Sequence, residues 1–308
     1  MSAPASTATA ERARVEADAL DTRDLGQPIK GPSALGSDPK RLWHLTWALA
    51  KTEFKLAFFG SALGYLWQLM RPLLLFGVIY GVISAVAHGL GKGVPFFPVS
   101  ILLGIVMFNF LSEATGGSVT SLLNRENLVR KIEFPRLAVP LSTVTTALMN
   151  FGLNAIPVIV FLLAAGGSAM WSWLEVPLLV LLLAAFMAGL GMILSVGYVY
   201  YRDVRPIWEV VLQTTFYASP IFYPITAAEK TFTVLGAQIN LAHVMMANPF
   251  VALLVQMRHV LIDPRYPSAA NAIGGSAMLL IPIGIWLVTI VVGFLFFDRQ
   301  APRVAERL

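Results

Sequence analysis

The sequence contains no cysteine among its 308 residues, and only 13% of the residues are charged. The missing cysteine excludes disulfides and thiolate metal sites. The charged fraction is well below the roughly 25% that is typical of soluble domains, so most of the chain cannot face water. A phosphate-binding loop is also missing. The nearest fragment, Gly89-Leu-Gly-Lys-Gly93, lacks the Ser or Thr that follows the lysine and ligates magnesium.

No arrangement of residues points to catalysis or to a bound cofactor. The histidines do not have the spacing of a metal pair, and the glycine pattern of a nucleophile elbow is missing. We therefore predict that the chain is not an enzyme and has no catalytic residue, no metal and no cofactor of its own. The net charge of +5 fits a nucleic-acid partner less well than basic residues that mark the cytoplasmic side of a membrane protein, so we predict no nucleic-acid partner.

Large apolar residues are almost missing from Met1–Lys40, which is rich in Ala, Ser, Thr, Pro, Gly and charge. A segment of this composition does not bury enough apolar surface to fold, and we predict that it is a disordered cytoplasmic tail. It also lacks the apolar region of a signal peptide.

Long apolar runs dominate the rest of the chain. A helix needs roughly 20 apolar residues to cross a bilayer, and continuous runs such as Val176–Leu194 and Ala277–Phe297 reach that length. Membrane-spanning β-barrels instead show short alternating segments. We therefore predict an all-α integral membrane protein, with six transmembrane helices in residues 61–298. They lie at about Tyr65–Ala87, within Val94–Leu123, and at about Leu137–Ala165, Leu174–Tyr198, Ile207–Tyr223 and Ile273–Phe297.

Residues 41–60 interleave apolar and charged side chains at helical spacing. Trp43, Trp47, Ala50 and Phe54 recur on one side, with lysines between them. This pattern predicts an N-terminal amphipathic helix that lies in the membrane interface. The alternative is an ordinary surface helix packed on the rest of the protein. The two tryptophans and the spanning run that follows favour the interface.

The basic residues predict the orientation in the membrane. Six spans put both termini on one side, and cytoplasmic segments carry an excess of Lys and Arg. Only Lys92, Lys230, Arg258 and Arg265 fall on the opposite side. We therefore predict cytoplasmic termini, with residues 299–308 as a second cytoplasmic tail.

The connection at residues 224–271, on the predicted outer side, is long. It contains apolar stretches that are too short to cross a bilayer, such as Ala247–Ile262. We predict that these form outer re-entrant or interfacial helices.

Charges near the cytoplasmic ends of the spans are candidate functional residues. Asn124–Pro140 is basic and amphipathic, and it is either a helix that docks on a soluble partner or a loop that only sets topology. Arg202 and Asp203, at the cytoplasmic end of the fourth span, either pair with each other, lock the flanking spans or contact a partner. Arg71 and Glu113 lie in or near the membrane, where charges usually pair, and they either form an ion pair with each other or contact the substrate.

Aromatic residues are enriched in the spans that would face a channel. Aromatic rings stack on sugar faces, so a glycan chain slides along them without one tight site. Trp and Tyr also gather at any membrane interface, and Phe fills any core, so a structural role is the alternative for each residue. The candidates are Tyr65, Trp67, Phe76, Tyr80, Phe108, Phe216, Tyr217, Phe222 and Tyr223.

Four segments, in chain order, resemble the membrane-spanning permease subunits of polysaccharide-exporting ABC transporters of the ABC-2 type, which handle O-antigen, capsule and teichoic-acid precursors. The segments are LGYLWQLMRPLLLFGVIYGV (Leu63–Val82), NRENLVRKIEFPRLAVPLSTV (Asn124–Val144), YYRDVRPIWEVVLQTTFYASPIFYP (Tyr200–Pro224) and ANPFVALLVQMRHVLID (Ala247–Asp263). The resemblance covers residues 40–297, and residues 1–40 have no counterpart in it.

The resemblance implies a homodimer in the cytoplasmic (inner) membrane, with two separate ATP-binding subunits that hold ATP and magnesium. It implies a substrate glycan built on polyprenyl pyrophosphate, such as an O-antigen, a teichoic acid or a cell-wall glycan. The substrate would enter laterally near the interface helix, with Lys51, Lys55 and Arg71 close to the pyrophosphate, and the outer helices would form a gate. A cytoplasmic coupling helix would seat in the ATPase through Asn124, Arg125, Glu126, Asn127, Leu128, Val129, Arg130, Lys131, Phe134 and Pro135.

Three other functions remain open from the sequence. An ABC exporter of a drug or of another lipid shares the architecture. An integral membrane glycosyltransferase that uses a polyprenyl lipid needs an acidic residue in a loop, and its candidates, Asp203 and Asp263, fall on opposite sides of the membrane. An ion-coupled secondary transporter often has interrupted spans, and Pro157 and Pro282 interrupt two of the predicted spans. Such a transporter also uses ionisable groups inside the membrane, and acidic residues are sparse here.

Overall fold

The computed structural model describes residues 39–59, 64–86, 91, 93–130, 134–229, 231–234 and 237–307. The tail predicted at residues 1–40 lies almost entirely outside this part of the chain. Its last two residues begin helix α2 (Pro39–Phe58), which therefore starts slightly before the boundary predicted at residue 41.

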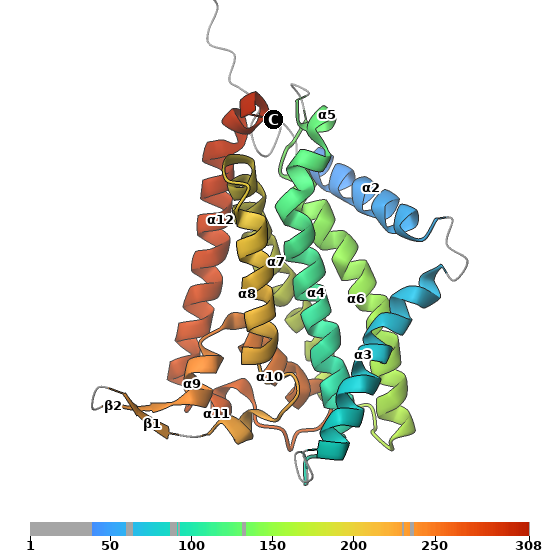
Figure 1. Ribbon diagram of the computed structural model, residues 1–308, viewed down its shortest axis with the longest axis vertical. Helices are drawn as coiled ribbons and strands as arrows, with labels where there is room; N and C mark the ends of the chain where they lie inside the picture. Colours follow the sequence, from blue (N-terminus) through green and yellow to red (C-terminus); the bar gives the residue numbers. More distant parts are fainter. Residues whose placement is uncertain are drawn as a thin grey trace, which may run out of the picture. The chain divides into compact units, whose positions relative to one another are not determined.

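Within the described residues, five helices are long and apolar enough to cross a membrane. They include α3 (Tyr65–Val86), α4 (Phe97–Asn124), α6 (Ala138–Ala164), α7 (Val176–Tyr200) and α12 (Leu280–Arg307), and they form an upright bundle (Figure 1). The spans are Leu66–Val86, Phe97–Asn124, Ala138–Ala164, Trp171–Tyr200 and Ser276–Val304. The prediction of a helical membrane protein is confirmed at this level.

The predicted fifth span corresponds to α8 (Val204–Ala218), which has only 15 residues. At 1.5 Å per residue its length is about 22 Å, less than the roughly 30 Å of a bilayer core. Pro220 and Pro224 follow it, and the chain then enters the short helix η3 (Ile225–Ala228). The number of six spans therefore remains a prediction.

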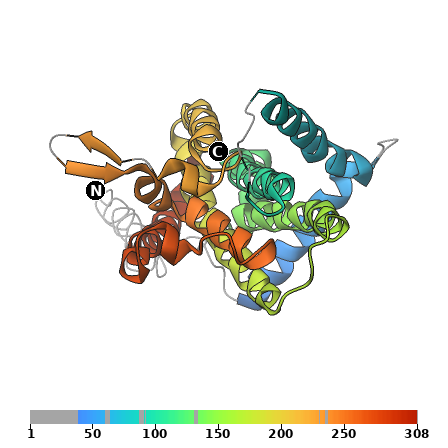
Figure 2. The same ribbon diagram turned by 90° about the horizontal axis from the view of Figure 1, so that it is seen from below.

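One short hairpin is a local exception in the otherwise helical fold. Strands β1 (Thr231–Val234) and β2 (Ala237–Asn240) pair antiparallel, with Thr231 opposite Asn240. The sequence TFTV alternates polar threonine with apolar Phe232 and Val234, the period-two pattern of hairpin strands. The hairpin projects from one end of the bundle (Figures 1 and 2), which is called the hairpin end below. The opposite end, with α5 (Glu126–Val129) and the last turns of α12, is called the α5 end.

Short helices fill the hairpin end. They are η2 (Trp171–Glu175), α9 (Leu241–Met246), α10 (Pro249–Leu261), α11 (Ala269–Ala272) and η4 (Ser276–Leu279). Helix α10 belongs to the stretch predicted to be re-entrant, and most of its residues are buried in the main core, around Phe250 and Leu254. An apolar helix too short to cross a bilayer is thus covered by protein, as backbone at membrane depth requires.

Helix α4 is the centre of the bundle and supplies much of the main core, between α6 and α7. Helices α7 and α12 approach closely because glycines face each other. A Cβ added at Gly293 would collide with the carbonyl oxygen of Gly189, and one added at Gly189 would lie 3.0 Å from the Cα of Ile290. Small residues allow such backbone contact between membrane helices.

A second core cluster lies at the α5 end. It joins Val129 of α5 to Phe297, Ala301 and Val304 of α12. The predicted tail at 299–308 is therefore not separate from the bundle, because α12 continues to Arg307 and its Ala301 and Val304 are buried.

Helix α2 packs on α6 through one face and leaves the other open. Thr46 and Ala50 are buried, and the Thr146 hydroxyl of α6 lies 3.3 Å from the Ala50 carbonyl oxygen. Trp43 and Trp47 stack on each other and remain 63% and 47% exposed. An exposed tryptophan pair at helical spacing fits the predicted interface helix.

Candidate functional site

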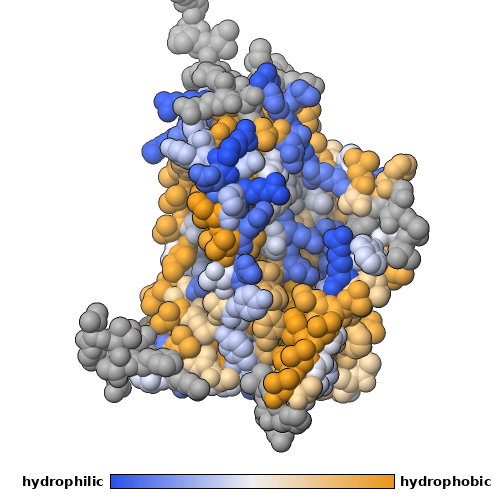
Figure 3. Space-filling view, viewed as in Figure 1, coloured by the Kyte–Doolittle hydropathy of each residue, from blue (hydrophilic) through white to orange (hydrophobic). Residues whose placement is uncertain are grey.

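One face of α4 carries a polar stripe. At 100° per residue, its members fall on one side of the helix, within about 140°, and none of them is fully buried. Hydrophilic residues gather on this face between α8 and α3 (Figure 3). The polar stripe consists of Asn109, Ser112, Glu113, Gly116, Gly117, Thr120 and Asn124.

Cavities lie on both sides of the stripe. The first, the α3-side cavity, has a volume of about 620 Å³ and lies among α2, α3, α4 and α6, with Glu53, Gln68, Arg71 and Asn150 in its wall. The second, the α8-side cavity, has a volume of about 310 Å³ and lies between α4 and α8. Thr120 lines both. The two cavities therefore meet at Thr120 and follow the stripe from Ser112 to Asn124.

Glu113 is held in the α3-side cavity by two amides. Gln68 of α3 donates to its Oε1 over 3.0 Å, and Asn150 of α6 donates to its Oε2 over 2.9 Å. The alternative of an ion pair between Glu113 and Arg71 is wrong: Arg71 lines the same cavity but forms no ion pair with Glu113. The amides satisfy the carboxylate in its place, and the Arg71 side chain remains exposed.

The three predicted pyrophosphate contacts are not brought together. Arg71 lines the α3-side cavity, to which α2 contributes Glu53, Leu56 and Ala57. Lys51 and Lys55 are exposed on α2 and do not line the cavity.

The α8-side cavity contains an arginine and a carboxylate from α8. Arg205 pairs with Glu209 over 3.1 Å within one turn of the helix, and both side chains remain largely exposed. Trp208 donates to the hydroxyl of Thr115 on α4 over 3.0 Å. This bond fixes the start of α8 against α4 beside the stripe.

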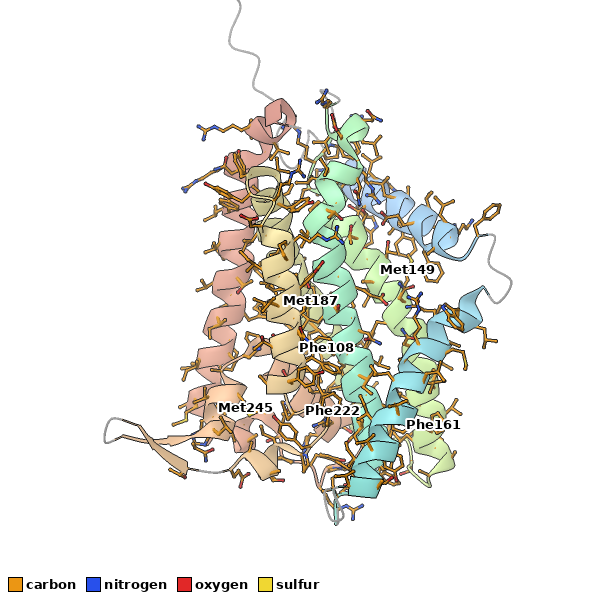
Figure 4. The ribbon with its side chains drawn as sticks, viewed as in Figure 1. Phe108, Met149, Phe161, Met187, Phe222 and Met245 are labelled. Carbon is orange, nitrogen blue, oxygen red and sulfur yellow. The ribbon has the colours of Figure 1, made fainter. Side chains whose placement is uncertain are left out.

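Several of the predicted channel aromatics form one cluster near the hairpin end. Phe216 of α8 lies 4.7 Å from Phe108 of α4 and 4.8 Å from Phe222, measured between ring centroids. Figure 4 shows Phe108 and Phe222 close together in this part of the bundle. Phe108 is only 9% exposed, so it belongs to the core in this conformation, whereas Tyr217 is 65% exposed.

The remaining aromatics are spread more widely. Phe76 stacks on Tyr80 at 5.7 Å and also contacts Phe161 of α6. Trp67 is 45% exposed on α3, and Tyr223 is half-buried after α8. The side chain of Tyr65 lies outside the described part of the chain.

The predicted coupling segment contains the short helix α5. Asn124, Asn127 and Arg130 are exposed, and Arg130 pairs with Glu126 over 2.6 Å. Other members face inward: Val129 and Pro135 are buried, Phe134 packs on the second core cluster, and Leu128 is half-buried. Lys131 lies outside the described residues. The surface that this segment offers to a partner is therefore smaller than the predicted list.

Arg125 of the coupling segment also points inward. It forms an ion pair with Glu53 of α2 and donates to the Ser142 hydroxyl of α6 over 2.6 Å. Thr146 donates to the same Glu53 carboxylate over 3.1 Å. Arg125 thus connects the coupling segment to the interface helix at the wall of the α3-side cavity.

Two buried arginines, which the sequence did not single out as sites, anchor loops to the bundle. Arg136 donates to the carbonyl oxygens of Val129 and Ala301. Arg258 of α10 donates to the carbonyls of Ile221 and Ser100 over 2.9 and 3.2 Å. Burial lowers the pKa of Arg258 to about 10, so it remains charged at neutral pH.

Arg202 and Asp203 do not pair with each other in the described structure. Arg202 lies over the Tyr198 ring at 5.0 Å, and both Arg202 and Asp203 are exposed at the start of α8. Asp263 follows α10 and pairs with Arg265, so the two candidate acids of a glycosyltransferase lie at opposite ends of the bundle. Among the described residues no three His, Asp or Glu side chains gather as a metal site.

Comparison with known proteins identifies the family. The model of the ABC-2 type transporter family matches residues 44–254, which include α2, the polar stripe, α5 and α8. The chain belongs to the ABC-2 type transporter family. It is a transport subunit and not an enzyme, and ATP is hydrolysed by a separate ATP-binding protein.

Curated relatives within the family share about a quarter of their residues with this chain. An O-antigen export system permease protein RfbA from Myxococcus xanthus is 28% identical over 72% of this chain and 82% of its own length. A protein of the same name from Klebsiella pneumoniae is 24% identical over 87% of this chain and 96% of its own length. The polysialic acid transport protein KpsM from Escherichia coli is 22% identical over 82% and 92%, respectively.

Proposed function

We propose that the chain is the membrane subunit of an exporter that moves a polysaccharide, carried on polyprenyl pyrophosphate, across the cytoplasmic membrane. The observation that carries the proposal is the polar stripe along α4, with a cavity on each side of it. A glycan needs a polar path through the bilayer, and polar groups facing lipid are costly. The printed functions of the relatives, O-antigen export and polysialic acid transport, support the same class of cargo.

The proposed assembly is a homodimer. Apolar residues such as Val78 on α3 and Val210 on α8 are exposed on the helices that flank the stripe. A single copy would present the stripe to lipid, whereas a second copy facing it would enclose a central path. Cyclic pairs are also the commonest form of homo-oligomer.

The α5 end is proposed to face the cytoplasm. Exposed basic residues lie there, among them Arg130, Arg202 and Arg299, whereas the described hairpin end has Arg265 and the buried Arg258. This asymmetry supports cytoplasmic termini. The proposal includes a sixth crossing, made by α8 together with the segment that follows it, because α12 must return the chain to the α5 end.

Two ATP-binding subunits, with ATP and magnesium, are proposed to dock at α5. Asn127 and Arg130 are the exposed candidates for the contact. Motion of α5 would reach the interface helix through the Arg125–Glu53 ion pair. This link runs directly past the α3-side cavity.

The lipid-linked substrate is proposed to approach between α2 and α3, where the α3-side cavity is lined by Arg71. The exposed Lys51 and Lys55 would attract the pyrophosphate from the membrane surface and are not part of the cavity. The aromatic cluster of Phe216, Tyr217 and Phe222 near the hairpin end is proposed to contact the sugar chain on its way to the outer gate formed by α9–α11.

The test is purification of the chain from its native cells in mild detergent, followed by mass spectrometry of the proteins and lipids that copurify. The proposal expects a stoichiometric ATP-binding subunit and a polyprenyl-linked glycan. A chain that never yields an ATP-binding subunit, even after crosslinking, contradicts the proposed assembly. An ATP-binding subunit found with a different lipid contradicts the proposed cargo alone.

A further inference from the structure

Glu113 is a carboxylate on a membrane-spanning helix that no cation neutralises in the described structure. Each of its oxygens accepts one amide hydrogen bond, from Gln68 or from Asn150. An ionised carboxylate offers about four acceptor positions, so half of them remain open. Such a group is expensive to keep inside a membrane protein unless it is used.

A second acceptor beside it has no partner. The amide oxygen of Asn150 is buried and accepts no hydrogen bond, although its nitrogen is committed to Glu113. Asn150 also lines the α3-side cavity. Buried polar atoms are normally satisfied, so an orphaned acceptor on a cavity wall calls for a donor from a ligand or from water.

The same cavity contains a cation without an ion-pair partner among the described residues. Arg71 is exposed in it. Glu53 and Arg125, which also line the cavity, form an ion pair with each other. The cavity wall therefore contains acceptors that are open to hydroxyl donors and a guanidinium that is open to an anion.

We propose that the α3-side cavity recognises the sugar that is attached directly to the phosphate of a lipid-linked glycan. Glu113 and Asn150 accept hydrogen bonds from the hydroxyls of that first sugar, and Arg71 binds the adjacent phosphate. The volume of about 620 Å³ lies in the usual range of small-ligand sites, roughly 300–1,000 Å³. The inference rests on the proposed function and adds that the sugar next to the carrier is selected before export begins.

The experiment compares three lipids on the complete complex with its ATP-binding subunits, in nanodiscs of neutral phosphatidylcholine. The probes are a polyprenyl-pyrophosphoryl disaccharide, bare polyprenyl pyrophosphate and phosphatidylglycerol, which combines phosphate and hydroxyls in an ordinary membrane lipid. Wild-type complex is expected to bind the disaccharide lipid about tenfold more tightly than the bare pyrophosphate, since a site built on hydrogen bonds rejects ligands that leave them unmade.

The variants separate the two halves of the site. Glu113→Gln is expected to abolish the preference for the disaccharide lipid while binding of the bare pyrophosphate stays the same. Arg71→Gln is expected to weaken both pyrophosphate lipids equally. Glu175→Gln, the same substitution at an exposed position of the hairpin end, serves as the matched control and is expected to behave as wild type. An unchanged preference in Glu113→Gln, or equal binding of phosphatidylglycerol, overturns the proposal.

A second measurement does not depend on the folding of the Glu113 variant. Because the chain has no cysteine, Thr143→Cys introduces a single thiol on the cavity wall, and Asp298→Cys introduces one outside it. The disaccharide lipid should protect only the first from a charged thiol reagent, at lower concentration than the bare pyrophosphate does. Equal protection by the two lipids overturns the sugar site. Failure of the wild-type complex to bind either polyprenyl lipid overturns the proposed function itself.

Discussion

At the residue scale, the charges inside the bundle divide into two buried arginines that hold the fold and a half-buried carboxylate, Glu113, that keeps hydrogen-bond positions open. Arg258 and Arg136 each reach carbonyl oxygens of distant segments, which is how a buried guanidinium is made tolerable. Glu113 is also hydrogen-bonded, but by neutral amides and without an ion pair. The two arginines therefore anchor distant segments, whereas Glu113 keeps hydrogen-bond positions available for a ligand.

Arg258 should be essential for the stability of the hairpin end. Replacing it in Arg258→Met leaves the carbonyls of Ile221 and Ser100 buried without their donor, and the cost should be about 2–4 kcal/mol. A clear fall in the melting temperature of the detergent-purified protein is expected. Arg265→Met changes an exposed arginine at the same end, and this control should have the melting temperature of the wild type. Equal melting temperatures of the two variants would show that the Arg258 hydrogen bonds contribute nothing to stability.

The coupling surface can be tested at the exposed residues alone. Asn127→Ala together with Arg130→Ala should reduce binding of the ATP-binding subunit at least tenfold without lowering the melting temperature, since neither side chain is buried. Pull-down of the partner and thermal melting measure the two effects. Arg265→Ala, an arginine at the other end, is the control. Phe134→Ala is unsuitable as a test because Phe134 packs on the second core cluster. Full binding of the ATP-binding subunit by the double variant would refute the assignment of the coupling surface.

At the element scale, the α7–α12 contact depends on glycine. In Gly293→Leu the new side chain meets the backbone of Gly189, which cannot yield as a flexible side chain would. Forced separation of the helices should cost about 1–3 kcal/mol. Gly284→Leu on the same helix has open space around its Cβ position and should be tolerated. The melting temperatures of the two variants are compared. Equal stability of Gly293→Leu and Gly284→Leu would show that the close approach of α7 and α12 does not stabilise the protein.

Elements with a long apolar run or a regular helical pattern of apolar residues were predictable from the sequence. The five long spans follow from apolar runs, and α2 follows from tryptophans interleaved with lysines. Helix α8 and the hairpin were harder, because aromatic residues extend the apolar run past the end of α8 and a four-residue strand lies below the length at which periodicity is informative. The extent of α12 was missed because its last turns carry charges, although Ala301 and Val304 pack on the core.

The site was predictable only in part. Arg71, Glu113 and Asn150 stand out as polar residues in apolar runs, but their partners lie far apart in sequence. Spacing along the chain does not reveal that Glu113 bonds Gln68 and Asn150, or that Arg125 turns from the coupling segment toward Glu53. Pairing of two intramembrane charges is a reasonable default; here amide donors replaced the cation.

At the scale of the whole molecule, the orientation is open to a direct experiment. The absence of cysteine allows single thiols to be placed at Arg265→Cys on the hairpin end and Arg202→Cys on the α5 end, both at exposed positions outside the spans. In intact cells, a membrane-impermeant thiol reagent should label the first and not the second, because basic residues concentrate at the α5 end. After permeabilisation both should react. The reverse pattern in intact cells would invert the proposed topology.

The central claim is that this chain, with ATP-binding subunits, moves a lipid-linked glycan through the membrane. The most direct measurement reconstitutes the complex in proteoliposomes with a labelled polyprenyl-pyrophosphoryl oligosaccharide and follows its accessibility to an added glycosidase on the far side. We expect the glycan to cross only when ATP and magnesium are supplied on the α5 side, and crossing to stop in the Asn127 and Arg130 double variant. ATP hydrolysis by an intact complex without movement of the glycan would contradict it.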